Sequence, residues 1–450
     1  MTALVTHPSK NGAVGRRSPE AALDEIVGLV EAIGVDVVDA SIAPIGRPRP
    51  ATLFGVGKVR EIRDRLALTE PRPDLVVVDG ALTPVQHRNL EKEWGVKVLD
   101  RTALILEIFG ARASTAEGRL QVDLAHLTYQ RSRLVRSWTH LERQRGGAGF
   151  LGGPGERQIE SDRRALKDKI ARLKKRLDQV RRTRTLQRAK RKKAPHPVVA
   201  FVGYTNAGKS TLFNRLTQSN VFAKDLLFAT LDPTMRAVDA PSGERLILSD
   251  TVGFVSDLPT QLVAAFRATL EEVNEADILV HVRDVAHADA DAQRDDVVAV
   301  LRDLGVEEVG NGPVVIEALN KIDLLDPDER AAAAAIARAS RDDADMTLDD
   351  PARVALSAVT GEGVTALLAL IDEAATRDRR VFAVRLGPAD GAARAWLHAH
   401  GEVIEGAAGD DAILAARLSD KARGQFEKAF PGVVLAEAPL SPATISVARA

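Results

Sequence analysis

The chain has 450 residues, of which 45% are hydrophobic and 28% charged, a composition typical of a soluble globular protein with about three domains. No cysteine is present, which excludes disulfides, thiol catalysis and cysteine-ligated zinc and fits a reducing compartment. No apolar run approaches the roughly 18 residues that a membrane-spanning helix needs. We therefore expect a monomeric, cytoplasmic protein without a membrane span.

Charge is segregated along the chain. The net charge is -1, yet the stretch 163–193 alone contains 16 Lys and Arg residues against 2 acidic ones, a local charge of +14. The rest of the chain therefore carries -15. A single basic segment on an otherwise acidic protein indicates a localised contact with a polyanion.

The N-terminal part alternates between helical and strand patterns. Residues 1–18 are polar and lack the apolar core of a secretory signal, so we expect a disordered tail there. Residues 19–113 are expected to form an α/β domain with a small parallel sheet. Its helices are predicted at 21–33, 58–68, 84–94 and 102–113, and its strands at 35–38, 74–78 and 96–99.

Residues 114–194 have heptad-like spacing of apolar side chains instead. One apolar seam spans 120–141 and a second spans 159–180. Two long helices with narrow apolar seams are expected to pack as an antiparallel hairpin. The tip of this hairpin, residues 146–155, is rich in glycine and cannot continue a helix.

The remaining chain returns to alternating strands and helices. Within residues 195–376, strands are predicted at 198–202, 246–248, 278–282 and 314–319. Residues 377–450 contain strand candidates at 381–386 and 412–416, each followed by a helical stretch. These patterns predict a second α/β domain at 195–376, followed by a small C-terminal α/β domain without a readable motif.

A phosphate-binding loop follows the strand at 198–202 and precedes a helical stretch. It matches the pattern G-x-x-x-x-G-K-[ST], with the residues Gly203, Tyr204, Thr205, Asn206, Ala207, Gly208, Lys209 and Ser210. Its glycines let backbone N–H groups converge on phosphate oxygens at a helix N-terminus. Lys209 is expected to reach the β- and γ-phosphates, and the Ser210 hydroxyl to bind Mg²⁺.

A second motif selects the base. It consists of Asn320, Lys321, Ile322 and Asp323 and comes directly after the strand at 314–319. The Asp323 carboxylate can accept two hydrogen bonds from guanine N1–H and its 2-amino group, which adenine does not offer. After another strand, guanine O6 can receive backbone N–H groups from Ser357, Ala358 and Val359. The pair of motifs predicts GTP and GDP, rather than ATP, as ligands.

Two further stretches are typical of nucleotide-dependent switches. The first contains Asp250, Thr251, Val252 and Gly253, where Asp250 can hold Mg²⁺ through water and the Gly253 amide can sense the γ-phosphate. The second contains Phe228, Ala229, Thr230, Leu231 and Asp232. Thr230 and Thr234 are both chemically able to close on the metal, and their spacing does not decide between them.

The residue after Gly253 is Phe254, where many GTPases carry a glutamine that orients the attacking water. Phenylalanine can neither orient nor deprotonate water. We therefore expect slow intrinsic hydrolysis, with the water positioned by the backbone, the metal site or a partner.

These residues resemble the HflX family, in the Obg–HflX branch of translational GTPases. The resemblance spans about residues 52–376 and, besides the phosphate and base motifs, rests on the stretches 55–59 (GVGKV), 100–106 (DRTALIL), 117–122 (EGRLQV), the glycine-rich tip through 156, and 250–254 (DTVGF). The family implies a Ras-like P-loop G domain, an N-terminal α/β domain with a helical hairpin, and a small C-terminal domain.

The resemblance also implies a function. It is that of a GTP hydrolase, stimulated by ribosomes, that splits or rescues stalled ribosomes or acts in their assembly. Catalysis would depend on Lys209, Thr230 and Gly253, with Thr230 preferred as the switch ligand of Mg²⁺. The implied partner is the large ribosomal subunit, whose rRNA would be contacted by the basic hairpin at 146–193.

Two alternatives remain at the level of sequence. The basic helix is either a solvated face or an RNA contact, and RNA is favoured because like charges on one helix repel each other unless phosphate relieves them. The G domain could instead act as a switch that controls a protein partner rather than a ribosome. An ATP-driven remodeller is disfavoured by the guanine motif at 320–323.

Overall fold

The protein is seen in a computed structural model that describes residues 1–10, 17–144, 154–191, 196–218, 228, 234–256, 273–274, 276–306, 312–340, 345–377, 379–387, 389–404 and 412–437. These residues form two compact units. The first comprises 1–187, 198–238 and 246–367, and the second comprises 188–197, 239–245 and 368–450.

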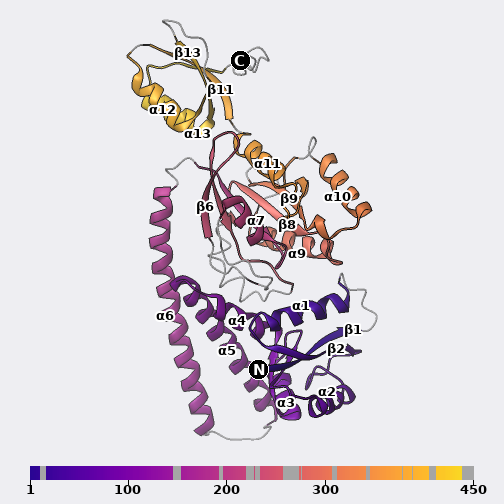
Figure 1. The fold of residues 1–450 in the computed structure, drawn as a ribbon. Helices are drawn as coiled ribbons and strands as arrows, with labels where there is room; N and C mark the ends of the chain where they lie inside the picture. The colour runs from indigo at the N-terminus through magenta and orange to yellow at the C-terminus, as the bar shows by residue number, and fades with distance from the viewer. Residues whose placement is uncertain are drawn as a thin grey trace. The chain divides into compact units, whose positions relative to one another are not determined.

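The N-terminal part of the first unit is a four-stranded parallel sheet in the order β2-β1-β3-β4 (Figure 1). Its strands are β1 (Thr2–Lys10), β2 (Asp36–Ile45), β3 (Leu75–Val78) and β4 (Lys97–Asp100). Its helices are α1 (Pro19–Glu31), α2 (Val56–Leu68), α3 (Pro84–Trp94) and α4 (Arg101–Arg112). All four helices agree with the predicted positions to within two residues at each end.

The disordered tail expected at residues 1–18 is wrong for residues 2–10, which form β1. This strand lies inside the sheet, between β2 and β3. The short run Ala3, Leu4 and Val5 is fully buried, which offsets the polar residues around it. The prediction failed because three apolar residues give a weak periodic signal, whereas pairing on both edges decides the structure.

Both faces of this sheet are covered, as expected of a parallel sheet. Side chains alternate along β3: Leu75 and Val77 belong to one apolar core with α1 and α4, and Val76 and Val78 belong to another with α2 and α3. The first core continues into the G domain, where it includes Phe228. The N-terminal sheet and the G domain thus share apolar packing within one unit.

The helical hairpin follows α4. It consists of α5 (Ala116–Gln144) and α6 (Pro154–Arg191), which lie side by side and run in opposite directions (Figure 1). Ile170 and Leu177, one heptad apart in the predicted seam, are both buried. The glycine-rich tip lies outside the described residues from 145 to 153.

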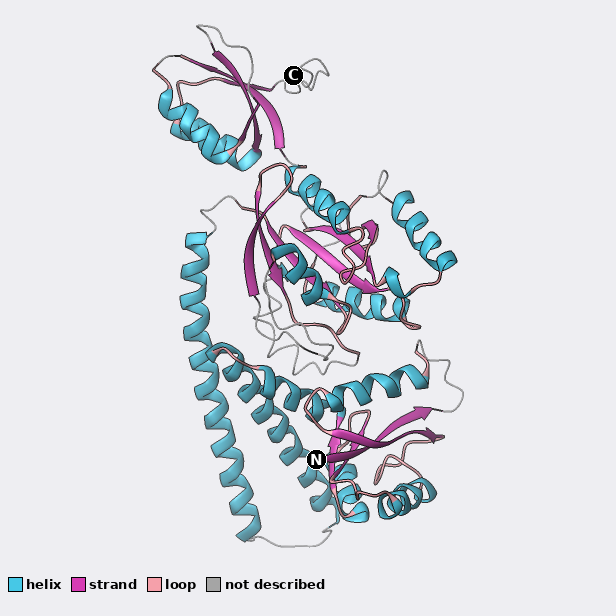
Figure 2. Cartoon of the chain, in the orientation of Figure 1, coloured by secondary structure: helices cyan, strands magenta, loops and turns pink. Residues whose placement is uncertain are grey.

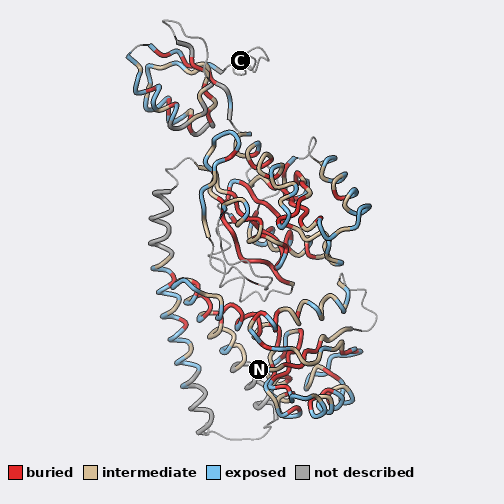
Figure 3. Tube along the Cα trace, in the orientation of Figure 1, coloured by how far each residue is buried: buried red, intermediate tan, exposed pale blue. Residues whose placement is uncertain are grey.

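The G domain is built on a six-stranded sheet in the order β10-β9-β8-β5-β7-β6. Its strands are β5 (Val198–Gly203), β6 (Thr234–Asp239), β7 (Arg245–Asp250), β8 (Ile278–Asp284), β9 (Val314–Asn320) and β10 (Ala352–Ala355). Its helices are α7 (Lys209–Thr217), α9 (Ala290–Asp303), α10 (Pro327–Ala339), α11 (Val364–Thr376) and the 3₁₀ turn η1 (Ile322–Leu324). The central strands are almost entirely buried (Figure 3).

This sheet has a topological switch point next to β5. The strand pairs in parallel with β7 on one side and with β8 on the other. In open α/β sheets, ligands bind beyond the carboxyl ends of the strands at such a point. The phosphate loop begins where β5 ends, and the base motif begins where β9 ends.

The second unit contains a four-stranded antiparallel sheet in the order β12-β13-β11-β14, with α12 and α13 packed on one face (Figure 2). Its elements are β11 (Arg379–Leu386), α12 (Gly391–His400), β12 (Glu402–Ile404), β13 (Ala412–Ser419), α13 (Asp420–Ala429) and β14 (Leu435–Glu437). The rings of Trp396, Phe426 and Phe430 pack against one another in its core at tilted or edge-on angles. Among the described helices of the whole chain, none is long and apolar enough to cross a membrane.

Candidate guanine nucleotide site

The phosphate loop has a backbone that depends on two glycines. Gly203 has φ 148°, and a Cβ at this position would collide with the carbonyl oxygen of Val282 in β8. Gly208 has φ 95° and lies against the side-chain amide of Asn320. Because only glycine adopts these backbone angles without strain and without a colliding Cβ, the spacing of the motif reflects the geometry of the loop.

Lys209 is the first residue of α7 and lies within the loop rather than in solvent. Its Nζ donates to the carbonyl oxygens of Gly203, at 3.1 Å, and Tyr204, at 2.7 Å. Burial lowers the pKa of Lys209 to about 8, and the nearby Asp250 carboxylate opposes this shift. A buried ammonium held by two neutral carbonyls is well placed to pair with a phosphate.

Thr205 provides a further polar group in the same loop. Its side chain is buried, and its hydroxyl oxygen has no hydrogen-bond partner among the described residues. A buried hydroxyl without a partner is costly unless a ligand or water satisfies it. This observation fits a loop that is shaped around phosphate oxygens.

Ser210 and Asp250 supply the chemistry of a magnesium site. The Ser210 hydroxyl donates to Oδ2 of Asp250 at 2.7 Å, which brings the end of β7 against the first turn of α7. Asp250 is completely buried. A hydroxyl and a carboxylate oxygen are the hard oxygen ligands that Mg²⁺ prefers, so these residues fit the metal.

Asn320 connects the two halves of the site. Its Nδ2 donates to the carbonyl oxygen of Ala207 in the phosphate loop at 2.7 Å, and its Oδ1 accepts from the backbone N–H of Ala358 at 2.9 Å. The whole residue is only 1% exposed. Asn320 therefore holds the phosphate loop and the predicted O6-binding loop in a fixed relation.

The other residues of the two base motifs lie in the turns that follow β9 and β10. Asp323 lies in η1, exposed, so that its carboxylate is available to a ligand. Lys321 has φ 69°, and its Nζ pairs with Oδ2 of Asp284 at 2.7 Å. Ser357 is completely buried and caps its own turn by accepting from the backbone N–H of Thr360 at 3.1 Å.

The segment after β7 is paired directly with the phosphate loop. The backbone N–H of Phe254 donates to the carbonyl oxygen of Gly203 at 3.1 Å, and that of Thr205 donates to the carbonyl oxygen of Phe254 at 2.7 Å. A Cβ on Gly253 would lie 2.9 Å from Nζ of Lys209. Gly253, the predicted sensor of the γ-phosphate, therefore packs against Lys209, the residue predicted to bind the β- and γ-phosphates.

Phe228, the first residue of the predicted switch stretch, packs in an apolar core of the first unit. Its ring meets Phe109 of α4 edge-on, with 4.7 Å between the ring centroids. The other predicted switch residues, namely Ala229, Thr230, Leu231 and Asp232, lie outside the described part of the chain, and the competing Thr234 begins β6. The choice between Thr230 and Thr234 stays a prediction.

Sequence reasoning missed several residues that support the site. They are Arg215 in α7, which contacts the O6-binding loop, and a cluster at the phosphate loop formed by Glu25, Arg17, Arg101 and Ser256. Only Arg101 lies in a stretch that carries the family resemblance, 100–106, and no role was predicted for it there. Glu25 contacts Arg17, which is 8 residues away, and also Arg101, Tyr204 and Ser256, which are 76, 179 and 231 residues away. No local pattern encodes such contacts.

The strand order, the phosphate loop and the base motif define a P-loop GTPase. Three family models match the chain: "GTP-binding GTPase N-terminal" at residues 20–110, "GTP-binding GTPase Middle Region" at 112–191 and "50S ribosome-binding GTPase" at 198–321. The GTPase HflX of Magnetococcus marinus is 48% identical over 92% of this chain and 93% of its own length. That of Escherichia coli is 43% identical over 84% of each chain.

The chain belongs to the HflX family of GTPases, and its activity is the hydrolysis of GTP. Among solved structures, a GTP-binding protein from Sulfolobus solfataricus in complex with GDP is 23% identical. The match covers 84% of this chain and 99% of that chain, with a TM-score of 0.45.

Proposed function

We propose that GTP binds across the ends of β5 and β9, with its phosphates in the loop 203–210 and its base between Asp323 and the loop 357–359. The support is the fixed spacing between these loops, which Asn320 provides through its hydrogen bonds to Ala207 and Ala358. A rigid frame lowers the entropic cost of binding. Lys209 neutralises phosphate charge in this arrangement, and Asp323 selects guanine.

In this proposal Ser210 binds Mg²⁺ directly, Asp250 binds it through water, and Thr230 closes on it from the switch. The metal neutralises charge that develops on the phosphate oxygens. The Gly253 amide contacts the γ-phosphate. Because Phe254 is 2% exposed and cannot act on water, intrinsic hydrolysis is slow and a partner stimulates it.

We further propose that this partner is the large ribosomal subunit, and that the protein splits or rescues stalled ribosomes or acts in their assembly. The family model over residues 198–321 is described as a ribosome-binding GTPase, which supports the partner. The basic helix α6 supports an rRNA contact. The observation that carries the proposal is the charge of a groove between α5 and α6.

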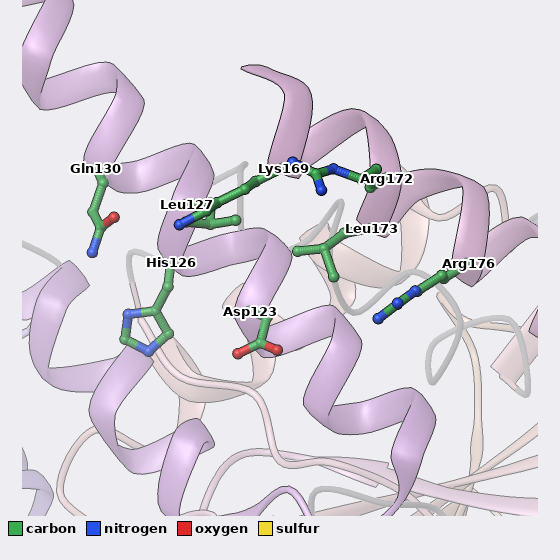
Figure 4. Close-up of a pocket in the computed structure, with 8 residues that line it drawn as sticks. All are labelled: Asp123, His126, Leu127, Gln130, Lys169, Arg172, Leu173 and Arg176. Carbon is green, nitrogen blue, oxygen red and sulfur yellow. The ribbon is translucent and has the colours of Figure 1, made fainter. Parts of the chain in front are cut away.

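This groove has a volume of about 440 Å³ and is lined by both helices of the hairpin (Figure 4). From α6 come Lys169, Arg172 and Arg176, which lie on successive turns, and from α5 come Asp123, His126 and Gln130. Leu127 and Leu173 complete the lining. The groove thus combines three cations with one carboxylate.

The three cations have no carboxylate partner among the described residues. Arg172 donates from Nε to the backbone carbonyl oxygen of Asp168 at 3.3 Å, which leaves its charge unpaired. Like charges on successive turns of a helix destabilise it. RNA phosphates remove this repulsion and release counterions, which makes the binding sensitive to salt. An RNA backbone is therefore the ligand that the groove fits.

The test compares two triple variants on the same helix. Lys169→Gln, Arg172→Gln and Arg176→Gln together remove the groove cations, and Lys167→Gln, Lys174→Gln and Lys175→Gln together remove three exposed cations outside the groove. Both lose three charges. Co-sedimentation with purified large subunits is measured with a non-hydrolysable GTP analogue, with GDP and without nucleotide, at several salt concentrations.

We expect retention to require the GTP analogue and to weaken with salt. The groove triple is expected to lower affinity at least about tenfold more than the control triple and to reduce the salt slope by about 2, as loss of phosphate contacts predicts. Equal losses in both triples would assign binding to diffuse charge rather than to the groove. If the wild type is not retained in any state, a protein partner becomes the better proposal.

A further inference from the structure

A cluster of polar side chains joins α1 and α4 to the nucleotide site. The Tyr204 hydroxyl, in the phosphate loop, donates to Oε2 of Glu25, and Arg17 donates to the same hydroxyl at 2.8 Å. The backbone N–H of Ser256 donates to the Tyr204 hydroxyl at 2.7 Å. One tyrosine oxygen therefore joins the phosphate loop, the segment after β7 and the N-terminal helix.

Glu25 holds both sides of this junction. Its Oε1 accepts from the Ser256 hydroxyl at 2.9 Å and also from Arg101, while its Oε2 accepts from Tyr204. Arg101 in turn donates to the Ser256 hydroxyl at 2.7 Å and to Asp79 at 2.7 Å. Every side chain of this cluster is paired, because each one hydrogen-bonds to at least two other members of the cluster or to a carboxylate outside it.

The cluster is buried and electrostatically matched. The side chains of Glu25 and Arg101 are 10% and 7% exposed. Burial alone would raise the pKa of Glu25, but Arg101, the Tyr204 hydroxyl and Arg17 together hold it below its usual range. A buried, hydrogen-bonded charge cluster resists rearrangement, because a partner removed from it leaves an uncompensated charge.

The held segment lies directly beside the phosphate loop. Ser256 comes two residues after Phe254, whose N–H and carbonyl groups pair with Gly203 and Thr205. At 2.7 Å between the Thr205 nitrogen and the Phe254 oxygen, no phosphoryl group fits between these two backbone stretches. The pairing is compatible with a nucleoside diphosphate, but a γ-phosphate between the loop and the Gly253 amide requires it to open.

We propose that Glu25 is a positioning residue that sets the preference of the site between GDP and GTP. Through Tyr204 and Ser256 it keeps the 253–256 segment paired with the phosphate loop, so that GTP must break this pairing and GDP need not. The proposal rests on the nucleotide site proposed above. It is independent of the ribosome.

The energetic consequence follows from population shift. A ligand that binds only the open state has its affinity reduced by the fraction of molecules that are open, and a ligand that binds both states does not. Weakening the cluster by one buried hydrogen bond raises the open fraction about fivefold. Affinity for GTP should rise by this factor, while affinity for GDP stays constant.

The test uses the two tyrosines of the chain. Tyr204→Phe removes the hydroxyl that joins Glu25 to Ser256 and keeps the ring. Tyr129→Phe is the matched control, because its hydroxyl donates to Asp100 at 2.7 Å and contacts no residue of the phosphate loop. Affinities for fluorescent GDP and a non-hydrolysable GTP analogue are measured for each purified full-length variant, together with its thermal stability.

We expect Tyr204→Phe to raise the ratio of GTP-analogue to GDP affinity at least about fivefold. The GTP concentration for half-maximal hydrolysis should fall as well, because a larger fraction of the molecules is open to GTP. Tyr129→Phe should lower stability without changing the ratio. A variant that only loses stability would therefore leave the ratio of the two affinities unchanged.

An unchanged ratio in Tyr204→Phe would overturn the proposal. Ser256→Ala, which removes the hydroxyl bonds to Glu25 and Arg101, should change the ratio in the same direction and serves if Tyr204→Phe does not fold. Lys209→Ala tests the nucleotide site itself, on which the proposal about Glu25 rests. If Lys209→Ala binds both nucleotides as tightly as wild type, the nucleotide site itself is wrongly assigned and the proposal built on it falls.

Discussion

Arg215 donates from Nε to the carbonyl oxygen of Ala358 across 2.7 Å, and its guanidinium also reaches the carbonyl oxygen of Val359. Arg215 lies in α7, directly after the phosphate loop, so it ties the helix that bears the phosphates to the loop expected to bind guanine O6. A Cβ on Gly361, at φ 93°, would collide with this guanidinium. The loop is thus shaped around Arg215.

Arg215→Ala should therefore weaken GDP and GTP binding alike, by about tenfold, because the loop loses two hydrogen bonds to a charged group. The rate at saturating GTP should stay within about twofold of wild type, since the phosphate contacts remain. Arg302→Ala is the control, because Arg302 pairs with Asp349 on another loop of the G domain. A loss that differs between GDP and GTP would contradict a role at the base.

Asp323→Asn should convert base preference. An asparagine amide donates where the carboxylate accepts, which matches xanthine better than guanine. We expect GDP affinity to fall by at least about a hundredfold and xanthosine diphosphate to bind better than GDP. Asp328→Asn, an exposed residue in the first turn of α10, should bind GDP as wild type does. Unchanged GDP binding by Asp323→Asn would refute the assignment of the base.

Gly253→Ala should slow hydrolysis at least about tenfold, because small displacements of catalytic groups are costly. The added methyl group would lie 2.9 Å from Nζ of Lys209 and 3.0 Å from Cα of Thr205, so that either the ammonium or the backbone must move. Single-turnover GTP hydrolysis measures the effect. Gly46→Ala, whose methyl group meets no atom within 4 Å, should match wild type. Equal rates in both variants would show that Gly253 is not needed for close approach.

His281 should make the G domain less stable in acid. Burial lowers the pKa of His281 to about 4, while Glu317 opposes the shift and Arg283, Arg294 and Lys209 add to it. The folded state therefore excludes a proton that the unfolded state binds below a pKa of about 6.5. Stability is present above this value and is lost as the pH falls, by about 2 kcal/mol between pH 7 and pH 5.

Native-state hydrogen exchange of the β8 amides measures this loss at the two pH values. His281→Gln, which cannot titrate, should reduce the difference by about the same 2 kcal/mol, although it lowers stability at both pH values. An equal difference in wild type and variant would mean that other groups, such as Glu317, carry the pH dependence.

Local sequence patterns predicted much of the fold. The helices α1 to α4 and the strands β5, β7, β8 and β9 lie where periodicity placed them, because each has a buried face or a continuous apolar run. β1 was missed, since three buried apolar residues among polar neighbours do not form a periodic signal. β12 and β14, with three residues each, are too short for such a signal as well.

The nucleotide motifs were readable because their chemistry is local. A phosphate loop needs glycines, a lysine and a hydroxyl at fixed spacing on one turn of chain, and the guanine motif needs a carboxylate at a fixed distance from a strand end. Residues 203–210 and 320–323 therefore identified the ligand class from the sequence alone. The structure adds to the motif that the side chain of Asn320 joins two loops.

Only the tertiary structure brought Glu25 to Tyr204, which is 179 residues away, and to Ser256, which is 231 residues away. The sequence by itself determined the family, the nucleotide and the basic hairpin, because these depend on short-range spacing and on composition. Contacts such as Arg215 with Ala358 and Glu25 with Ser256 were decided by the packing of distant elements. Hydrogen bonds between such elements leave no periodic trace in the chain, since each partner has an ordinary local context and acquires its role only when the sheets and helices assemble.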